Sequence, residues 1–196
     1  MIAIIKYNAG NITSVQNALN KLRCESIITD DEETICKADK VIFPGVGEAS
    51  TAMQYLQERK LDALIKTLTQ PVLGICLGQQ LMCSYSEENN TNCLGIFDAT
   101  VKLFPPTELV PHMGWNNVES NNSGLFTGME KENNFYFVHS YYASICENTI
   151  ATCNYILPFS AAMQKDNFYA TQFHPEKSAS NGEKILKNFL NLTSTN

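Results

Sequence analysis

A cysteine flanked by glycines follows an apolar run in the segment PVLGICLGQQL at 71–81. Cys76 lies there in the pattern Gly-x-Cys-x-Gly, between a strand-like run and a helix-like run. In a nucleophile elbow the reactive residue lies on a sharp strand-to-helix turn, and the glycines leave room for the neighbouring backbone. The pattern therefore predicts either a nucleophilic thiol or a buried core cysteine beside glycines needed for tight packing.

Nucleophilic catalysis by a thiol requires a base, and the chain contains three histidines, His112, His139 and His174. His174 follows a strand-like run in FYATQFHPEKS, and Glu176 lies two residues further along. A carboxylate on the same side of an extended segment orients an imidazole and stabilises its charged form. We therefore predict Cys76, His174 and Glu176 as nucleophile, base and orienting group. His139 lies in an apolar run and is interpreted as a hydrogen-bonded sheet histidine, whereas the role of His112 stays open.

Backbone N–H groups near the cysteine are candidates for stabilising an oxyanion. The N–H of Leu77, directly after Cys76, is the first of these. The loop FPGVGEAS at 43–50 has three interpretations: a turn capped by Ser50, a phosphate-binding loop, or a second oxyanion donor or substrate wall. The phosphate interpretation ranks low because the Walker lysine and the full GxGxxG pattern are absent. Gln80 lies one helical turn after Cys76 and is a candidate for substrate contact.

The elements that must position these residues alternate between strand and helix in the first half. Strand-like runs lie at 2–7, 25–29, 40–44 and 71–75, and helical spacing follows at 12–22, 49–68, with a break near Lys60, and 77–86. This order indicates a parallel sheet covered on both faces. The second half has closely spaced strand-like runs at 99–104, 115–120, 134–140, 149–155, 160–166 and 168–173, and a final helix at 182–192. They predict antiparallel structure that extends the sheet, with a hairpin turn at Asp166–Asn167.

Composition and charge exclude several classes of function. With 44% hydrophobic and 17% charged residues, the chain has ordinary globular composition, and we expect one domain over 1–196. The net charge is −6 and there is no basic stripe, so nucleic-acid binding is not expected. The sequence has neither a basic leader nor an apolar run of roughly 20 residues, so we expect a cytoplasmic protein without membrane contact. The seven cysteines lack zinc-ligand spacing, which predicts free thiols and no metal.

Three motifs taken together resemble those of the class I, triad-type glutamine amidotransferases: PGVG at 44–47, GICLGQQL at 74–81 and HPEKS at 174–178. A narrower resemblance, to the glutaminase subunits of imidazole glycerol phosphate synthase, rests on YNAGN at 7–11, PHMGW at 111–115, YFVHSYY at 136–142 and Lys177. The resemblance covers essentially the whole chain. It implies an α/β, flavodoxin-like fold with a largely parallel central sheet flanked by helices and an antiparallel extension from the C-terminal half.

The resemblance also implies an activity and its residues. Cys76 attacks the side-chain amide of L-glutamine, His174 acts as base and then acid, and Glu176 orients His174. Ammonia leaves, a thioester on Cys76 is hydrolysed to glutamate, and no cofactor is needed. The implied oxyanion-hole residues are Gly45, Val46, Gly47 and Leu77, and the implied glutamine-binding residues are Gln80, Ser140 and Tyr141.

The implied partner is a (β/α)8-barrel cyclase subunit in a heterodimer. Ammonia passes to it through a channel and is used to make imidazole glycerol phosphate and aminoimidazole carboxamide ribotide in histidine biosynthesis. The positions that match this interface and channel are Asn11, Ser14, Trp115, Tyr136 and Lys177. Without the resemblance, Trp115 is interpreted as a core residue and Asn11 as a helix cap. Two departures are Gln79, where the subfamily often has an apolar residue, and Ser14, where it often has asparagine.

Three other functions remain open at this point. A glutaminase that supplies a different synthase, for example one for a modified sugar, has similar motifs, and the sequence does not determine the acceptor. A flavodoxin-like sensor domain could use Cys76 as an oxidation sensor. A scaffold subunit would not use it at all. Labelling of Cys76 by a glutamine-analogue electrophile distinguishes a glutaminase from the sensor, and a Cys76→Ala variant that keeps glutamine-dependent synthesis would support the scaffold.

Overall fold

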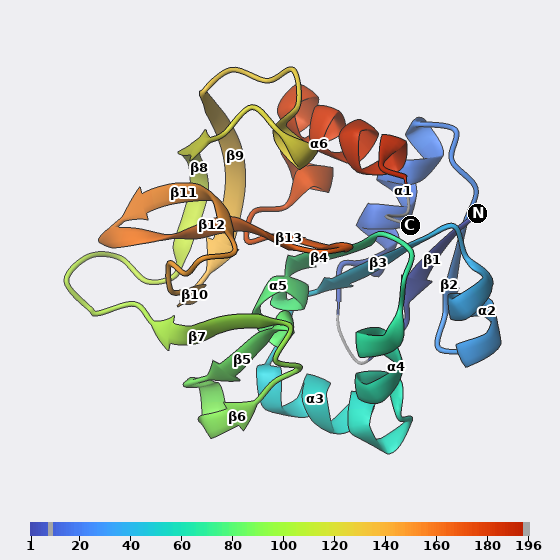
Figure 1. The fold of residues 1–196 in the computed structure, drawn as a ribbon. Coiled ribbons are helices and arrows are strands. Elements are labelled where there is room, and N and C mark those ends of the chain that lie inside the picture. The colour runs from blue at the N-terminus through green and yellow to red at the C-terminus, as the bar shows by residue number, and fades with distance from the viewer. Residues whose placement is uncertain (8–9, 194–196) are drawn as a thin grey trace.

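A sheet of nine strands forms the centre of the fold in the computed structural model, which describes residues 1–7 and 10–193 (Figure 1). Residues 8 and 9, which belong to the YNAGN motif, lie outside the described residues. The parallel half contains, in spatial order, β2 (Ser26–Thr29), β1 (Ile2–Ile5), β3 (Lys40–Gly45), β4 (Val72–Cys76) and β13 (Phe168–Thr171). The antiparallel half continues with β12 (Leu157–Lys165), β11 (Thr149–Tyr155), β8 (His112–Ser120) and β9 (Glu132–His139). The predicted fold class is confirmed.

Helices cover both faces of the parallel half (Figure 1). One face carries α1 (Ile12–Lys21) and α6 (Ala179–Asn191), and the other carries α2 (Glu32–Lys37), α3 (Ala49–Glu58), α4 (Leu61–Thr67) and α5 (Leu77–Met82). Alternate residues of β1 enter opposite cores: Ala3 and Ile5 pack with α3, whereas Ile2 and Ile4 pack with α1 and α6. This two-sided burial explains the continuous apolar run at the N-terminus. Within residues 1–7 and 10–193, no helix has both the length and the apolar character needed to cross a membrane.

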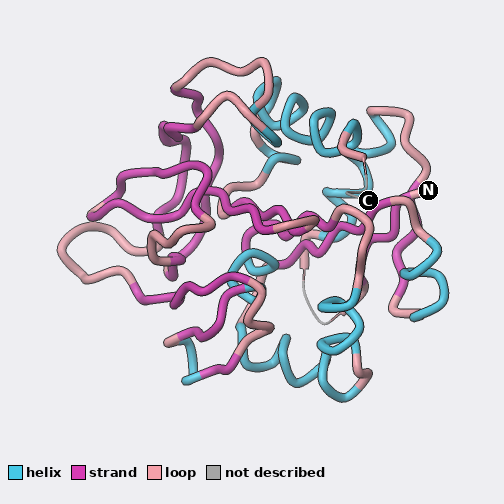
Figure 2. The backbone as a smooth tube through the Cα atoms, in the orientation of Figure 1, coloured by secondary structure: helices cyan, strands magenta, loops and turns pink. Residues whose placement is uncertain are grey.

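A second, smaller sheet was not expected from the sequence. It contains β10 (Tyr141–Ala143), β7 (Phe97–Leu103), β5 (Cys83–Ser86) and β6 (Thr91–Asn92), in that order, and Figure 2 shows these strands beside the main sheet. The prediction of one helix over 77–86 is therefore wrong, because α5 ends at Met82 and the chain continues as β5. The strand-like run at 99–104 joins this small sheet and does not extend the large one. Pairing of β5 with β7 overrides the local helical spacing, which contains no information about distant strands.

Two predicted chain reversals are confirmed. Lys60 separates α3 from α4 and adopts a left-handed conformation with φ of 59°. Asp166 and Asn167 form the two-residue connection of the β12–β13 hairpin, in which Lys165 is paired with Phe168 and Asp166 has φ of 52°. Such connections require positive φ, which aspartate and asparagine tolerate better than most residues. The hairpin pairs β13 with β12, and the other edge of β13 pairs with β4.

Close packing of α5 against β3 depends on a glycine. A Cβ atom at Gly78 would lie 1.9 Å from the backbone oxygen of Phe43, and one at Gly74 would lie 2.9 Å from the sulfur of Met82. The first contact involves backbone, so it cannot be relieved by a side-chain rotation. The glycines of the GICLG motif therefore allow the helix after Cys76 to pack directly on the sheet.

We expect Gly78→Ala to destabilise the protein by about 3 kcal/mol or more, because the added methyl group must displace the backbone of β3. Gly95→Ala serves as the matched control. Gly95 has φ of 70°, but a methyl group added there would meet no other part of the chain within 4 Å, so its substitution should cost only about 1–2 kcal/mol. Urea unfolding measures both. Equal losses for the two variants would contradict the packing argument.

Candidate active site

Cys76 ends β4 on the sharp turn that leads into α5. Its backbone has φ of 54° and ψ of −107°, a conformation that residues other than glycine rarely adopt. Such backbone strain costs on the order of 1–3 kcal/mol and persists only where the surrounding structure holds it. The residue is 5% exposed and lines a cavity at the carboxyl edge of the sheet. The structure therefore has the elbow geometry that the glycine pattern predicts. Cys76 is buried beside tightly packed glycines, as the core-cysteine interpretation expects, and it also lines the cavity, as the nucleophile interpretation expects.

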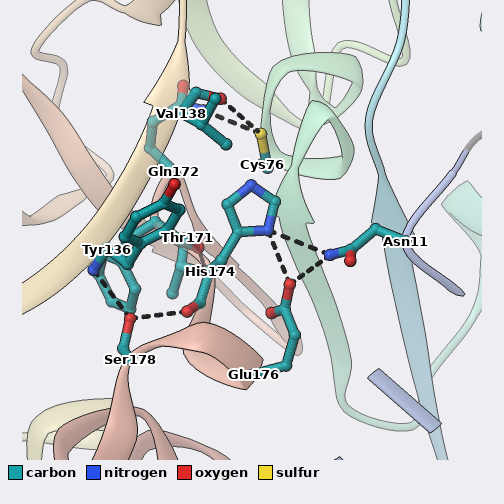
Figure 3. Close-up of polar contacts among 10 residues, drawn as sticks. Asn11, Cys76, Tyr136, Val138, Thr171, Gln172, His174, Glu176 and Ser178 are labelled. Atoms are coloured by element: carbon teal, nitrogen blue, oxygen red, sulfur yellow. Dashed lines mark hydrogen bonds and ion pairs between the residues drawn. The ribbon is translucent and has the colours of Figure 1, made fainter. Parts of the chain in front are cut away.

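His174 reaches the same edge because β13 lies parallel to β4. Thr171 is the register partner of Ile75, so the chain beyond β13 emerges next to Cys76. Figure 3 shows the imidazole between Cys76 and Glu176, with one ring nitrogen directed at the sulfur. Nδ1 lies 2.8 Å from Oε1 of Glu176, whereas the buried Nε2 has no hydrogen-bond partner among the described residues.

Glu176 approaches His174 by a route different from the predicted one. The expectation was an extended segment in which the two residues share a side. Instead Pro175–Lys177 form a 3-10 turn that brings the carboxylate back to the imidazole. The side chains of both residues are fully buried. Ser178 closes the turn, because its hydroxyl donates to the backbone oxygen of His174 at 2.7 Å.

Asn11 belongs to this hydrogen-bond network. It occupies the N-cap position of α1, but its side chain makes no capping bond. Its amide nitrogen instead donates to Oε1 of Glu176 and lies 3.3 Å from Nδ1 of His174 (Figure 3). The helix-cap interpretation is therefore wrong for the side chain, which helps to hold the carboxylate in place.

The pKa of His174 reflects opposing effects. Burial by itself lowers it, because the charged imidazolium loses water. The negative charges of Cys76 and Glu176, together with the hydrogen bond to Glu176, outweigh burial and raise the pKa to about 10. Because the folded-state pKa exceeds the ordinary value of 6.5, this interaction stabilises the fold fully below pH 6.5, and the stabilisation is lost as the pH rises through 10.

The cavity beside Cys76 has a volume of about 280 Å³. Its walls contain seven of the residues singled out from the sequence, namely Val46, Gly47, Cys76, Leu77, Gln80, Ser140 and Tyr141. Gly45 lies next to them, since it is the register partner of Cys76 on β3. Four further residues complete the lining: Glu88, Pro111, Val138 and His139.

The loop after β3 forms one wall of this cavity. The backbone oxygen of Val46 accepts a hydrogen bond from the N–H of Gly10 at 3.2 Å, and Gly47 has φ of 133°. The third interpretation of this loop, a wall beside the elbow, agrees with its position. The Ser50 cap is wrong, because Glu48 occupies the N-cap position of α3 and Ser50 lies inside the helix.

Two polar residues of the site were missed. Gln172 donates to the sulfur of Cys76 at 3.6 Å, and its Oε1 accepts from Gln80 at 3.0 Å. It lies two residues before His174, so the alternation of an extended segment could have found it. Glu88 accepts a hydrogen bond from the N–H of Ala49 at 2.7 Å and also lines the cavity. No local pattern distinguishes it from its neighbour in the sequence.

Of the residues predicted to contact a partner, Asn11 and Tyr136 bond directly to His174 or Glu176. Trp115 on β8 is 55% exposed and packs edge-on against Tyr136 on β9, with ring centroids 6.3 Å apart, so it is not a core residue. The backbone oxygen of Tyr136 accepts from the N–H of His174 at 3.0 Å. Ser14 is half-buried on α1, and Lys177 is exposed.

All seven cysteines are free thiols, and only Cys76 among them lines the cavity. In the part of the chain that the structure describes, no three His, Cys, Asp or Glu side chains are grouped so that they could hold a metal ion.

We expect Cys76→Ala to lower the pKa of His174, because it removes a negative charge that opposes the effect of burial. NMR titration of the His174 imidazole measures the shift. Cys153→Ala, which removes a buried thiol outside the cavity, should leave the pKa of His174 near 10. An unchanged value in Cys76→Ala would show that Glu176 alone determines it.

Comparisons with known proteins agree with this geometry. A family model described as glutamine amidotransferase class-I matches residues 3–192. The imidazole glycerol phosphate synthase subunit HisH of Bacteroides fragilis (strain YCH46) is 60% identical over 194 residues, covering 97% of this chain and 99% of that protein. The HisH subunit of Blochmanniella floridana is 48% identical over the same length and the same shares of both chains.

Solved structures support the same fold. A crystal structure of a glutamine amidotransferase aligns over 97% of both chains with a TM-score of 0.75 and 18% identity. The structure of PurLQS from Thermotoga maritima also aligns over 97% of both chains, with a TM-score of 0.72 and 15% identity. At these identities the likeness concerns the fold alone. From the family match over nearly its whole length, this chain belongs to the class-I glutamine amidotransferase family.

Proposed function

We propose that this chain is the glutaminase subunit of imidazole glycerol phosphate synthase. It hydrolyses L-glutamine to glutamate and ammonia and supplies the ammonia to a cyclase subunit in histidine biosynthesis. The observation that carries the proposal is the buried arrangement of Cys76, His174 and Glu176 beside a cavity of about 280 Å³. Relatives of 60% and 48% identity that bear the HisH name support the choice of synthase.

The proposed reaction begins with the thiolate of Cys76, which attacks the side-chain carbonyl carbon of glutamine. The raised pKa of His174 favours the imidazolium, so a proton is available on Nε2 for the departing ammonia. Loss of ammonia leaves a glutamyl thioester on Cys76. Neutral His174 then takes a proton from water, which attacks the thioester, and glutamate leaves as the thiolate is restored. Glu176 and Asn11 keep Nδ1 directed away from the sulfur throughout.

The tetrahedral intermediates need donors for their negative oxygen. Leu77 supplies the first N–H of α5, which has no acceptor within the helix, and lies directly after the nucleophile. We assign the second donor to the backbone of Gly45, Val46 and Gly47, because this segment lies beside Cys76. Gln80 and the backbone of Ser140 and Tyr141, on the cavity wall, are proposed to hold glutamine.

The α-ammonium group of glutamine requires a partner of opposite charge. Among the described residues that line the cavity, Glu88 is the one carboxylate, and its other role is to accept the N–H at the start of α3. We therefore assign Glu88 to the ammonium group. This assignment predicts that the cavity accepts an amino acid in preference to a simple amide.

The proposed partner surface is directly bonded to the site. Trp115 and Tyr136 are neighbours on β8 and β9, and the backbone of Tyr136 holds that of His174. Asn11, beside the same edge, bonds to Glu176. We propose that a (β/α)8-barrel cyclase subunit docks over these residues, Ser14 and Lys177. It would then contact residues that are themselves hydrogen-bonded to His174 or Glu176. We place the heterodimer in the cytoplasm and treat residues 1–196 as one domain.

The deciding assay combines the chain, the cyclase subunit, its ribonucleotide substrate and glutamine. We expect glutamine-dependent synthesis that is lost by at least about 10⁴-fold in Cys76→Ala, because no other thiol can form the thioester. Cys153→Ala should retain activity, and a glutamine-analogue electrophile should label Cys76. Hydrolysis by the isolated chain should be weaker than in the complex. Stimulation by an unrelated synthase and not by the cyclase would refute the histidine assignment.

Replacing Glu88 by glutamine should raise KM for glutamine by about tenfold or more, since a hydrogen bond to a charged group is lost. Glutamine keeps an oxygen that can accept the N–H of Ala49, so the start of α3 is preserved. Glu87→Gln, which neutralises the neighbouring carboxylate outside the cavity, is the control and should leave KM within about twofold. Steady-state kinetics of the complex provide the comparison, and equal KM values for the two variants would remove Glu88 from the substrate site.

A further inference from the structure

Two buried histidines face each other on neighbouring strands behind the cavity. His112 on β8 and His139 on β9 are register partners, 3% and 6% exposed, and Nδ1 of His112 lies 3.0 Å from Nε2 of His139. His112 is stacked on Tyr155 at 4.1 Å between centroids, and His139 meets Phe159 at 5.2 Å. The aromatic neighbours hold both imidazole planes, so the contact between the two nitrogens has a fixed geometry.

Asn116, which contacts His112 on the side away from His139, determines which nitrogen of His112 carries the proton. Oδ1 of Asn116 accepts from the N–H of Asn117 at 2.8 Å, and Nδ2 donates to the backbone oxygen of Asn154 at 3.2 Å. These two bonds orient the amide, so the nitrogen that lies 3.2 Å from Nε2 of His112 is a donor. Nε2 of His112 therefore accepts, and a neutral His112 carries its proton on Nδ1, facing His139.

The contacts of His139 place its proton on Nδ1 as well. Nδ1 of His139 lies 2.7 Å from the backbone oxygen of Tyr141, which can only accept. His139 therefore also carries its proton on Nδ1 and accepts from His112 on Nε2. Burial lowers the pKa of His112 to about 4 and, with the charges of His112 and His174, that of His139 to about 3. Both rings are neutral at pH 7, and every bond runs inward from Asn116 to Tyr141.

The chain of hydrogen bonds ends at the backbone oxygen of Tyr141. This oxygen belongs to segment 138–141, which contacts the sulfur of Cys76 and forms part of the cavity wall. The oxygen of Tyr141 also accepts from Gln80 at 2.9 Å, so two donors hold this peptide group. The oxygen of Val138 lies 3.9 Å from the sulfur of Cys76, and residues 139–141 line the cavity. A displacement of this short segment would therefore move the wall that glutamine contacts.

We propose that the His112–His139 pair positions segment 138–141 for glutamine binding, as a neutral hydrogen-bond chain that runs in one direction. The inference rests on the glutaminase function proposed above. Neither imidazole exchanges a proton with substrate, so both are positioning residues. His112 is outside the cavity lining and acts only through His139.

Leucine and asparagine substitutions test this, because the two side chains have the same shape and differ in hydrogen bonding. His139→Leu in the complex should raise KM for glutamine about tenfold, the worth of one buried hydrogen bond, with kcat within about threefold. In His139→Asn the amide can still donate to Tyr141, so KM should rise by about threefold or less. KM for glutamine should likewise be higher in His112→Leu than in His112→Asn. Urea unfolding of all four variants checks that each is folded under the conditions of the assay, since all of them lose a buried ring.

A measurement independent of activity tests the proton positions. Long-range ¹H–¹⁵N NMR spectra should show both histidines as Nδ1–H tautomers that do not titrate between about pH 5.5 and 9. An Nε2–H tautomer at either residue, or equal KM values for leucine and asparagine within either pair, would overturn the proposal. If the wild-type complex hydrolyses no glutamine, the proposed function and this role have both failed. An active wild type without the leucine–asparagine difference overturns this role alone.

Discussion

The parallel pairing of β13 with β4 is the interaction on which the site depends. It returns the C-terminal part of the chain to the middle of the sheet, so His174 emerges at the edge where Cys76 ends its strand. A shift of one residue in this pairing would turn the imidazole to the opposite face of the sheet. Asn167 limits that freedom, because its backbone oxygen accepts from the N–H of Val72 at 2.9 Å and its side chain donates to the backbone oxygens of Leu68 and Gln70, just before β4.

The backbone of the elbow adopts a conformation that a cysteine rarely adopts, and the surrounding core holds it in place. Cys76 has positive φ without being glycine, and Gly78 brings α5 into backbone contact with β3. The neighbouring residues Leu73, Ile75 and Leu77 are almost fully buried, so their burial offsets strain of a few kcal/mol. Backbone strain at a functional residue is common, since packing elsewhere supplies the necessary free energy.

Burial strengthens the hydrogen bonds of the site, because it excludes water from them. His174 and Glu176 are held by each other, by Asn11 and by the backbone of Tyr136, so little water competes for these bonds. Nε2 of His174 nevertheless has no partner among the described residues. An unpaired buried nitrogen is costly, and here it is directed at the position where sulfur and substrate would meet.

Local patterns in the sequence were sufficient to single out Cys76 and His174 and the strands that carry them. The apolar runs before Cys76 and His174 predicted buried strands, and the glycines around Cys76 predicted the elbow. The carboxylate two residues after His174 was correctly paired with it, although a 3-10 turn, not an extended strand, brings the two together.

Only the tertiary structure decided the rest, because it depends on contacts between residues that are distant in the sequence. Helical spacing after Met82 gave no sign that β5 would pair with β7. Likewise, nothing local distinguishes Glu88 as a cavity residue. The sequence by itself determined which residues carry a thiol, an imidazole or a carboxylate at the end of a strand. Strand register, packing and burial decided which of the other polar groups join them, since these act between segments whose separation no local pattern records.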